Sequence, residues 1–178
     1  MKQTAIIVFA LLCISSVNAQ TKGVGVELGF GVDAGVPVGN DLKQYTNWGF
    51  GGDATLGYNF NTQMALLVRG GYMSFAVKDE YKRNNLTAIG DGFMRLCGRY
   101  NFAGPFYIEP QIGYSTFGSG KSHEVKTGSG LTYAVAAGAF LDHSKAFEAS
   151  LRYEATASNN GIDFVGLRVS YSIKPGHY

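Results

Sequence analysis

The stretch GVGVELGFGVDAGVPVG, from Gly23 to Gly39, places an apolar residue at every even position. Its odd positions hold glycine, Pro37 and two acids, Glu27 and Asp33. Successive side chains of a β-strand point to opposite sides, so this alternation predicts a strand with one wholly apolar face. The opposite face combines nearly bare backbone with two carboxylates, and any function has to account for both faces.

The composition predicts a folded chain that is rich in strands and turns. Its 178 residues suggest one domain. Glycine is abundant at 25 residues, only 16% of the residues are charged, and 13% are aromatic. Disordered chains combine low hydrophobicity with high charge, which is not the case here. The formal net charge of +2 gives no reason to expect a nucleic acid as partner.

The N-terminus has the features of a secretory signal peptide. Lys2 supplies a positive charge, residues 5–14 are apolar, and residues 17–19 (Val-Asn-Ala) place small side chains where signal peptidase cuts. We therefore assign residues 1–19 to a cleaved signal and residues 20–178 to one domain. The apolar run is too short to span a bilayer, which takes about 20 helical residues.

The two cysteines add little chemistry. Cys13 leaves open a lipoprotein signal, although Leu12 stands where such signals carry a small residue. After cleavage the domain keeps Cys97 alone, so no intramolecular disulfide is expected. We interpret Cys97 as a small residue of a strand wall rather than as a metal ligand.

Period-two alternation continues along the chain and predicts eight strands joined by connections of alternating length. An even number of antiparallel strands, with short connections at one end and long ones at the other, is typical of an up-and-down transmembrane β-barrel. The predicted strands are residues 23–38, 48–60, 64–75, 89–102, 106–115, 131–141, 146–154 and 161–173. The short turns are 61–63, 103–105 and 142–145, and the long polar loops are 39–47, 76–88, 116–130 and 155–160.

Two features do not fit the pattern simply. Pro110 falls inside the fifth strand, where it has no ladder hydrogen to donate, so we expect a local bulge there. The third strand carries Leu67 and Met73 on its supposedly polar face, which makes its register the weakest of the eight.

Alternation alone also fits a soluble, lipocalin-like barrel, which turns its apolar face inward. The opposite face distinguishes the two classes, because in a soluble barrel it meets water and carries Lys, Glu, Gln and Thr. Here that face is mostly Gly, Ala and Ser with isolated charges. Small residues suit a narrow interior, so we place the apolar face against lipid.

The charged residues predict a network inside the barrel. Five of the six arginines fall on the non-apolar face of strands, whereas the nine lysines lie in the signal, the start, the loops, the turns or the tail. Arginine suits buried, forked pairing with carboxylates, and an unpaired buried charge is expensive. Acids share this face in nearly equal number. The predicted lumen network is Glu27, Asp33, Asp53, Arg69, Arg95, Arg99, Glu109, Glu148, Arg152, Glu154 and Arg168.

Aromatic residues gather at the strand ends, as in the two aromatic girdles of membrane barrels. Those near the short turns or the C-terminus are Tyr58, Phe60, Tyr100, Phe102, Phe106, Phe147 and Tyr171. Those toward the long loops are Trp48, Phe50, Tyr72, Tyr114, Tyr133 and Tyr153.

Several motifs add a family resemblance: VNAQ at the end of the signal, the strand ends LGYNF, CGRYNF and YIEPQIGY, and the last strand VGLRVSYSI. With these, the chain resembles the small outer-membrane barrels of the OmpA/OmpX-like superfamily, above all the outer-membrane β-barrel domain proteins of Bacteroidetes-type bacteria. The resemblance implies the outer membrane of a Gram-negative cell. It also implies a signal read by the barrel-insertion machinery at Gly166, Val169 and Tyr171, although here residues 174–178 follow the last strand.

Some barrels of this size are lipid-modifying enzymes with a His and a Ser on the outer surface. The candidates here are Ser122-His123-Glu124 and His143-Ser144. Adjacent residues on a strand point to opposite faces, so neither group is arranged for proton transfer. We therefore expect no catalysis and no cofactor. We also expect no metal site, because the histidines, including His177, fall in different connections.

An eight-stranded barrel is only just wide enough for its own side chains. With the predicted charges, Gln111, Phe140 and Phe164 facing inward, we expect a closed lumen in a monomer rather than a pore. The function then falls to the long loops, which are candidates to contact lipopolysaccharide or a surface protein. The alternatives are a lipid-modifying barrel enzyme, a soluble carrier, or a subunit of a larger envelope assembly.

Overall fold

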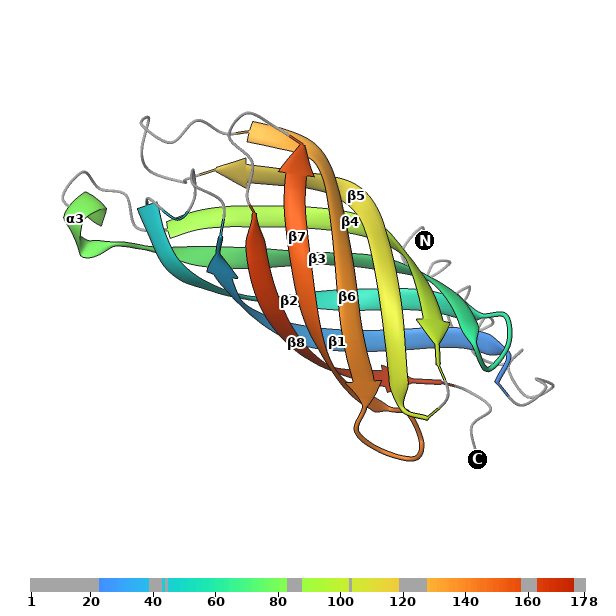
Figure 1. Ribbon diagram of the computed structural model, residues 1–178. Coiled ribbons are helices and arrows are strands. Elements are labelled where there is room, and N and C mark those ends of the chain that lie inside the picture. The colour runs from blue at the N-terminus through green and yellow to red at the C-terminus, as the bar shows by residue number, and fades with distance from the viewer. Residues whose placement is uncertain are drawn as a thin grey trace, which may run out of the picture.

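The computed structural model describes residues 23–38, 43, 45–82, 88–102, 104–118, 128–157 and 163–174. Eight antiparallel strands follow one another in sequence order, and the first pairs with the last, so the sheet closes into a barrel (Figure 1). The predicted fold class is confirmed, and the predicted signal peptide lies outside the described residues. The strands are β1 (Gly25–Pro37), β2 (Thr46–Asn59), β3 (Met64–Val77), β4 (Ala88–Asn101), β5 (Phe106–Gly118), β6 (Gly128–Phe140), β7 (Phe147–Ala157) and β8 (Phe164–Ile173).

The two ends of the barrel differ. β1 begins and β8 ends at the end of the barrel where β2, β4 and β6 turn tightly into the next strand (Figure 1). The short helix α3 (Asp79–Lys82) follows β3 at the opposite, long-loop end. Among the described residues, no helix has the length and apolar character needed to cross a membrane.

Six strands continue into segments that the alternation alone predicts as loops, including β2, which begins at Thr46, and β4, which begins at Ala88. The alternation weakens there because small and polar residues appear, but the ladders do not stop: Val77 pairs with Thr46, Phe117 with Gly128, and Ala157 with Leu131. β3, β5 and β7 therefore end at Val77, Gly118 and Ala157 rather than at 75, 115 and 154, and β6 begins at Gly128 rather than at 131.

The bulge expected at Pro110 is wrong. Pro110 pairs with Val135 of β6 in an unbroken register. Toward β4 the printed pairs stop at Cys97–Gln111 and resume at Tyr100–Ile108 in the same register, so no residue is inserted. A proline nitrogen that faces one neighbouring strand removes ladder contacts locally, and continuous pairing on its other side holds the strand in register.

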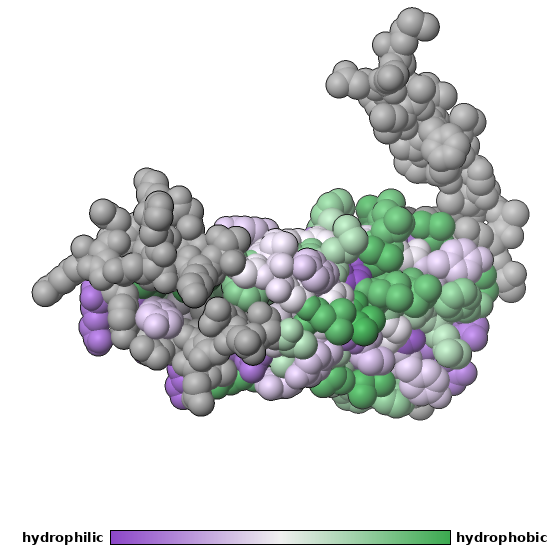
Figure 2. Space-filling model, turned by 90° about the horizontal axis from the view of Figure 1, so that it is seen from above, coloured by the Kyte–Doolittle hydropathy of each residue, from purple (hydrophilic) through white to green (hydrophobic). Residues whose placement is uncertain are grey.

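The outer face is apolar. Phe30 is 68% exposed and Met94 66% exposed, and on the described strands no charged side chain faces outward. Figure 2 shows apolar residues gathered over the middle and right of that view, with hydrophilic residues toward both ends. Such a surface is unfavourable in water, at about 25 cal/mol per Å² of apolar area, but it is suited to acyl chains.

The aromatic residues of both predicted girdles are exposed on this outer face. Near the short turns several of them pack in pairs: Tyr58 on Phe60, Tyr100 on Phe102, and Phe147 on Tyr171, whose ring centroids are 4.8 Å apart. Aromatic rings at this level are typical of the membrane–water interface, where an apolar body and a polar tip are both accommodated.

The glycines of the opening stretch make room inside. A Cβ atom added at Gly31 would lie 2.7 Å from the guanidinium of Arg168. At Gly49 of β2 it would lie 2.5 Å from the ring of Phe75. The bare backbone on the inner face is therefore occupied by large side chains from other strands, which is how so narrow a barrel can be filled.

Candidate functional site in the barrel lumen

The charged residues predicted for the lumen network lie on the inner side of the strands. Each of the eleven is buried, with at most 7% of its surface exposed. Each of them lies within ion-pair distance of an oppositely charged residue on a different strand.

Six of these side chains form a closed ring in which arginines and acids alternate. They come from β2, β3, β4, β5, β7 and β8, so the ring ties together most of the barrel wall. Each member contacts two partners of opposite charge, which offsets part of the desolvation cost of burying it. We call these six residues the ion-pair ring. Around it the nitrogen–oxygen distances are Arg69–Asp53 3.5 Å, Asp53–Arg168 2.7 Å, Arg168–Glu148 2.7 Å, Glu148–Arg99 3.1 Å, Arg99–Glu109 2.9 Å and Glu109–Arg69 2.7 Å.

A further acid and a lysine extend the ring toward the short turns. Glu27 of β1 lies 3.3 Å from Arg99 and 3.6 Å from the Nζ of Lys174. The same Nζ donates to the carbonyl oxygen of Lys145 at 3.0 Å and lies 4.4 Å from the ring centroid of Phe140. The strand pattern alone assigns Lys174 to the tail after the last strand. Its even position, in step with Arg168 on β8, was the signal that places it on the inner side.

A second set of charges lies beyond the ring, toward the long loops. Arg152 is 3.1 Å from Asp33 and 3.3 Å from Glu154, and Glu154 is 2.6 Å from Arg95. Asp91, which sequence reasoning missed, is also buried in the barrel, with 1% of its surface exposed. It stands four residues before Arg95 on β4, so the period of two already placed it inside.

A cluster of buried apolar side chains lies at the long-loop end of the lumen. This cluster, which we call the apolar cap, includes Met73, one of the two residues that made the third strand uncertain. The other, Leu67, packs with Ala65 and Cys97. The predicted register of the third strand is therefore correct, and its inner face is partly apolar. The apolar cap consists of Met73, Phe75, Val77, Ile89, Phe93, Phe117 and Phe164.

The residues considered for catalysis are not brought together. Ser122, His123 and Glu124 lie outside the described residues. In the turn between β6 and β7, the hydroxyl of Ser144 donates to Asp142, which also accepts the backbone N–H of Phe147 at 2.7 Å. The hydrogen bond from Ser144 is the main cause that lowers the pKa of the Asp142 carboxyl. These contacts stabilise the turn. Within the described part of the chain, no three His, Cys, Asp or Glu side chains are grouped as a metal site would need.

The residues of the proposed insertion signal lie on both faces of β8. Gly166 faces the lumen, while Val169 and Tyr171 are exposed on the outer face. Both exposed residues belong to the part of β8 that approaches the short-turn end.

A family model described as "outer membrane protein beta-barrel domain" matches residues 4–174. No curated protein matches the chain. Three solved barrels illustrate the structural similarity. Ail of Yersinia pestis has a TM-score of 0.53 and 11% sequence identity, and the match covers 84% of this chain and 97% of Ail. The N-terminal barrel domain of Pseudomonas aeruginosa OprF has a TM-score of 0.53 and 12% identity, with 83% of this chain and 97% of that domain covered. Neisserial surface protein A has a TM-score of 0.51 and 12% identity, with 85% of this chain and 97% of that protein covered.

Identities this low show a shared fold and nothing finer, whereas the family model spans nearly the whole chain. The alternative of a soluble carrier is wrong, because it requires the apolar face to point inward. The match and the uncharged outer face together lead to one conclusion. The chain belongs to the outer membrane protein beta-barrel domain family and is an integral β-barrel of the Gram-negative outer membrane.

Proposed function

We propose that this protein is a monomeric barrel with a closed, charge-lined lumen, and that its role is structural or lies in surface interaction at the long-loop end. The observation that carries the proposal is the double closure of the lumen. The ion-pair ring crosses it in one half, and the apolar cap fills it in the other.

The ion-pair ring supports closure because its members hold one another. Arg99 alone contacts Glu27, Glu109 and Glu148. A solute that crosses the lumen has to separate such pairs inside a low-dielectric barrel, where their attraction is much stronger than in water. Beyond the ring it meets the second set of charges, whose ion pairs have to be separated in the same way, and then the side chains of the apolar cap.

Solute passage can be measured directly. Vesicles carrying the refolded protein are placed in iso-osmotic L-arabinose, and swelling is followed by light scattering. We expect the rate of protein-free vesicles, with a general porin as the positive control. Swelling at a porin-like rate would contradict the closed lumen.

The long-loop end supports a role at the cell surface. Near this end several outward positions of β3, β4, β5 and β6 hold small or polar residues: Ser74, Gly90, Thr116 and Ser129. The aromatic residues below them mark the membrane interface, so these four strand ends extend beyond the bilayer. Helix α3, with the exposed side chain of Glu80, follows on the same side (Figure 1).

A photo-crosslinking amino acid at Glu80 tests this role on intact cells. A matched control carries it at Gln63, which is exposed in a short turn at the opposite end. We expect adducts with lipopolysaccharide or a surface protein from position 80 and not from position 63. Equal labelling from both, or none from position 80, would contradict a surface role.

We further propose that the barrel is not an enzyme and uses no cofactor. The engagement of Ser144 by Asp142 supports this, because a nucleophilic serine needs a base rather than a turn carboxylate as its acceptor. Alanine at Ser122, His123, His143 and Ser144 is expected to leave the lipid A mass profile unchanged. A changed profile would favour a lipid-modifying enzyme instead.

The partners that we propose follow from the same architecture. Outer-membrane lipid surrounds the apolar face, and the insertion machinery reads Gly166, Val169 and Tyr171 during biogenesis. Pairing of β1 with β8 leaves no free sheet edge, which supports a monomer. Crosslinking through the long loops would reveal a larger envelope assembly.

A further inference from the structure

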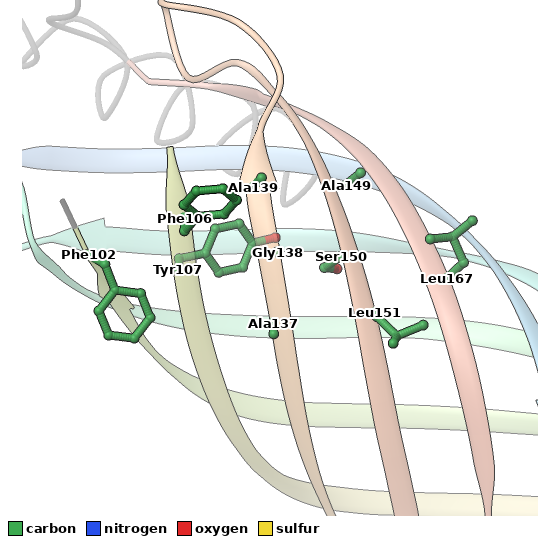
Figure 3. Close-up of a pocket in the computed structure, with 10 residues that line it drawn as sticks. All are labelled: Phe102, Phe106, Tyr107, Ala137, Gly138, Ala139, Ala149, Ser150, Leu151 and Leu167. Atoms are coloured by element: carbon green, nitrogen blue, oxygen red, sulfur yellow. The ribbon is translucent and has the colours of Figure 1, made fainter. Parts of the chain in front are cut away.

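The outer face is hollowed near the short-turn end. A groove of about 450 Å³ lies over β5, β6, β7 and β8 (Figure 3). This volume falls within the range of about 300–1,000 Å³ that ligand pockets in proteins have. Its lining includes Phe102, Phe106, Ala137, Ala139, Ala149 and Leu151.

The strand register explains the hollow. Across the sheet Phe106 pairs with Ala139 and Ala139 with Ala149, which puts two small side chains beside a large one. In the next outward row, Ala137 pairs with Leu151. The outward alanines form a low floor, and the phenylalanine and leucine side chains stand above it as walls.

The floor is closed toward the lumen. A Cβ atom added at Gly138 would lie 2.5 Å from the ring of Tyr107, so that ring fills the inner side of the sheet at this point. Tyr107 itself is buried, with 2% of its surface exposed. The groove therefore opens only on the outer face, and no charged residue lines it.

Its position identifies what covers it. The groove is continuous with the apolar surface that faces the bilayer, and Phe102 and Phe106 belong to the girdle near the short turns. In a membrane barrel the short turns lie on the periplasmic side. The groove therefore runs from the periplasmic interface, which Phe102 and Phe106 mark, toward the hydrocarbon of the periplasmic leaflet at Ala137 and Leu151.

We propose that this groove is a binding site for one acyl chain of a periplasmic-leaflet phospholipid. In hydrocarbon there is no hydrophobic gain from burying apolar surface, so the affinity arises from dispersion contacts. A chain on a flat wall is contacted from one side. In the groove the alanine floor and the walls contact it from several sides. The site thus selects hydrocarbon without a fixed headgroup contact.

Native mass spectrometry of the detergent-solubilised barrel with added palmitoyl-oleoyl phosphatidylethanolamine tests the proposal. The wild type is expected to retain one phospholipid. The variant Ala137→Leu/Ala139→Leu fills the floor, and we expect its lipid-bound fraction to fall about tenfold as those contacts are lost. The matched control is Ala54→Leu, the same change at an exposed alanine of β2 outside the groove, which should retain the lipid.

An unboiled gel band that shifts on heating verifies folding of each variant, and Ala149→Leu replaces the double variant if the latter does not fold. Equal retention by the groove variant and the control would overturn the proposal, as would a wild type that retains no lipid. A dimer of the protein in the mass spectrum of the wild type, absent from that of the groove variant, would also overturn the proposal. The groove would then bind a second copy of the protein.

Discussion

Two regions of the lumen differ in their chemistry. Near the short turns the ion-pair ring consists of charged groups that each require their neighbours. At the long-loop end the apolar cap consists of side chains that need only volume and shape. Both regions are equally buried, yet they respond differently to change. Removing one partner of a buried ion pair leaves an uncompensated charge, whereas a trimmed apolar side chain leaves a small cavity.

The largest effect is expected for Arg99→Met. Three buried acids, Glu27, Glu109 and Glu148, lose a cation. We expect the free energy of unfolding to fall by about 3–5 kcal/mol, measured by urea titration in detergent with the heat-shifted gel band as readout. Arg99→Lys keeps the charge and should lose less. A loss below that of a trimmed cap residue would remove the distinction between the two regions.

Phe93 lies where the apolar cap meets the second set of charges. The guanidinium of Arg95 lies 3.6 Å from the centroid of its ring. Phe93→Leu should cost about 2 kcal/mol, because a desolvated cation–π contact is lost. A double-mutant cycle with Arg95→Met isolates that contact. If the losses in free energy of unfolding from the two substitutions simply add, the apolar cap and the second set of charges stabilise the barrel independently.

Within the apolar cap, Ile89→Val removes one methylene group from a residue that is 3% exposed. We expect a loss of about 0.5–1.5 kcal/mol in the same urea titration. Val68→Ala, on the exposed outer face of β3, is a control for a trimmed side chain that meets lipid instead of the cap. A loss as large as that of Arg99→Met would show that the cap is as intolerant as the ion-pair ring.

The smallest effect concerns the turn at the ion-pair end. The pKa of Asp142 is lowered, chiefly by the hydrogen bond from Ser144. Because a lowered pKa favours the folded state when the carboxyl is ionised, this stabilisation is fully present above the unperturbed pKa of about 3.9 and is lost as the pH falls through the lower pKa of the folded state. Asp142→Asn should therefore be slightly less stable than wild type at pH 6. The difference in the free energy of unfolding should shrink as the pH is lowered through the acid range, and a difference that does not change with pH would contradict the assignment.

The sequence-based predictions were most accurate where they depended on local geometry. Because side chains alternate between the two faces of a strand, the sequence position of a residue indicates which face it lies on. Glu27 and Arg152 could therefore be placed inside without knowing their partners. The same rule applied consistently would have placed Asp91 and Lys174 inside as well. It could not predict how Pro110 is accommodated, because that depends on whether pairing with β6 continues through it.

The sequence by itself determined the lipid-facing side and the charged character of the inner wall, because side chains alternate between the two faces every two residues. It also determined the number of strands, because the alternation is interrupted at each connection. Only the tertiary structure decided which acid meets which arginine, which residues form the apolar cap, and where alanines from β6 and β7 leave a groove. The physical reason is that barrel closure sets the register between strands. Residues as distant in sequence as Asp53 and Arg168 become neighbours only when β1 pairs with β8.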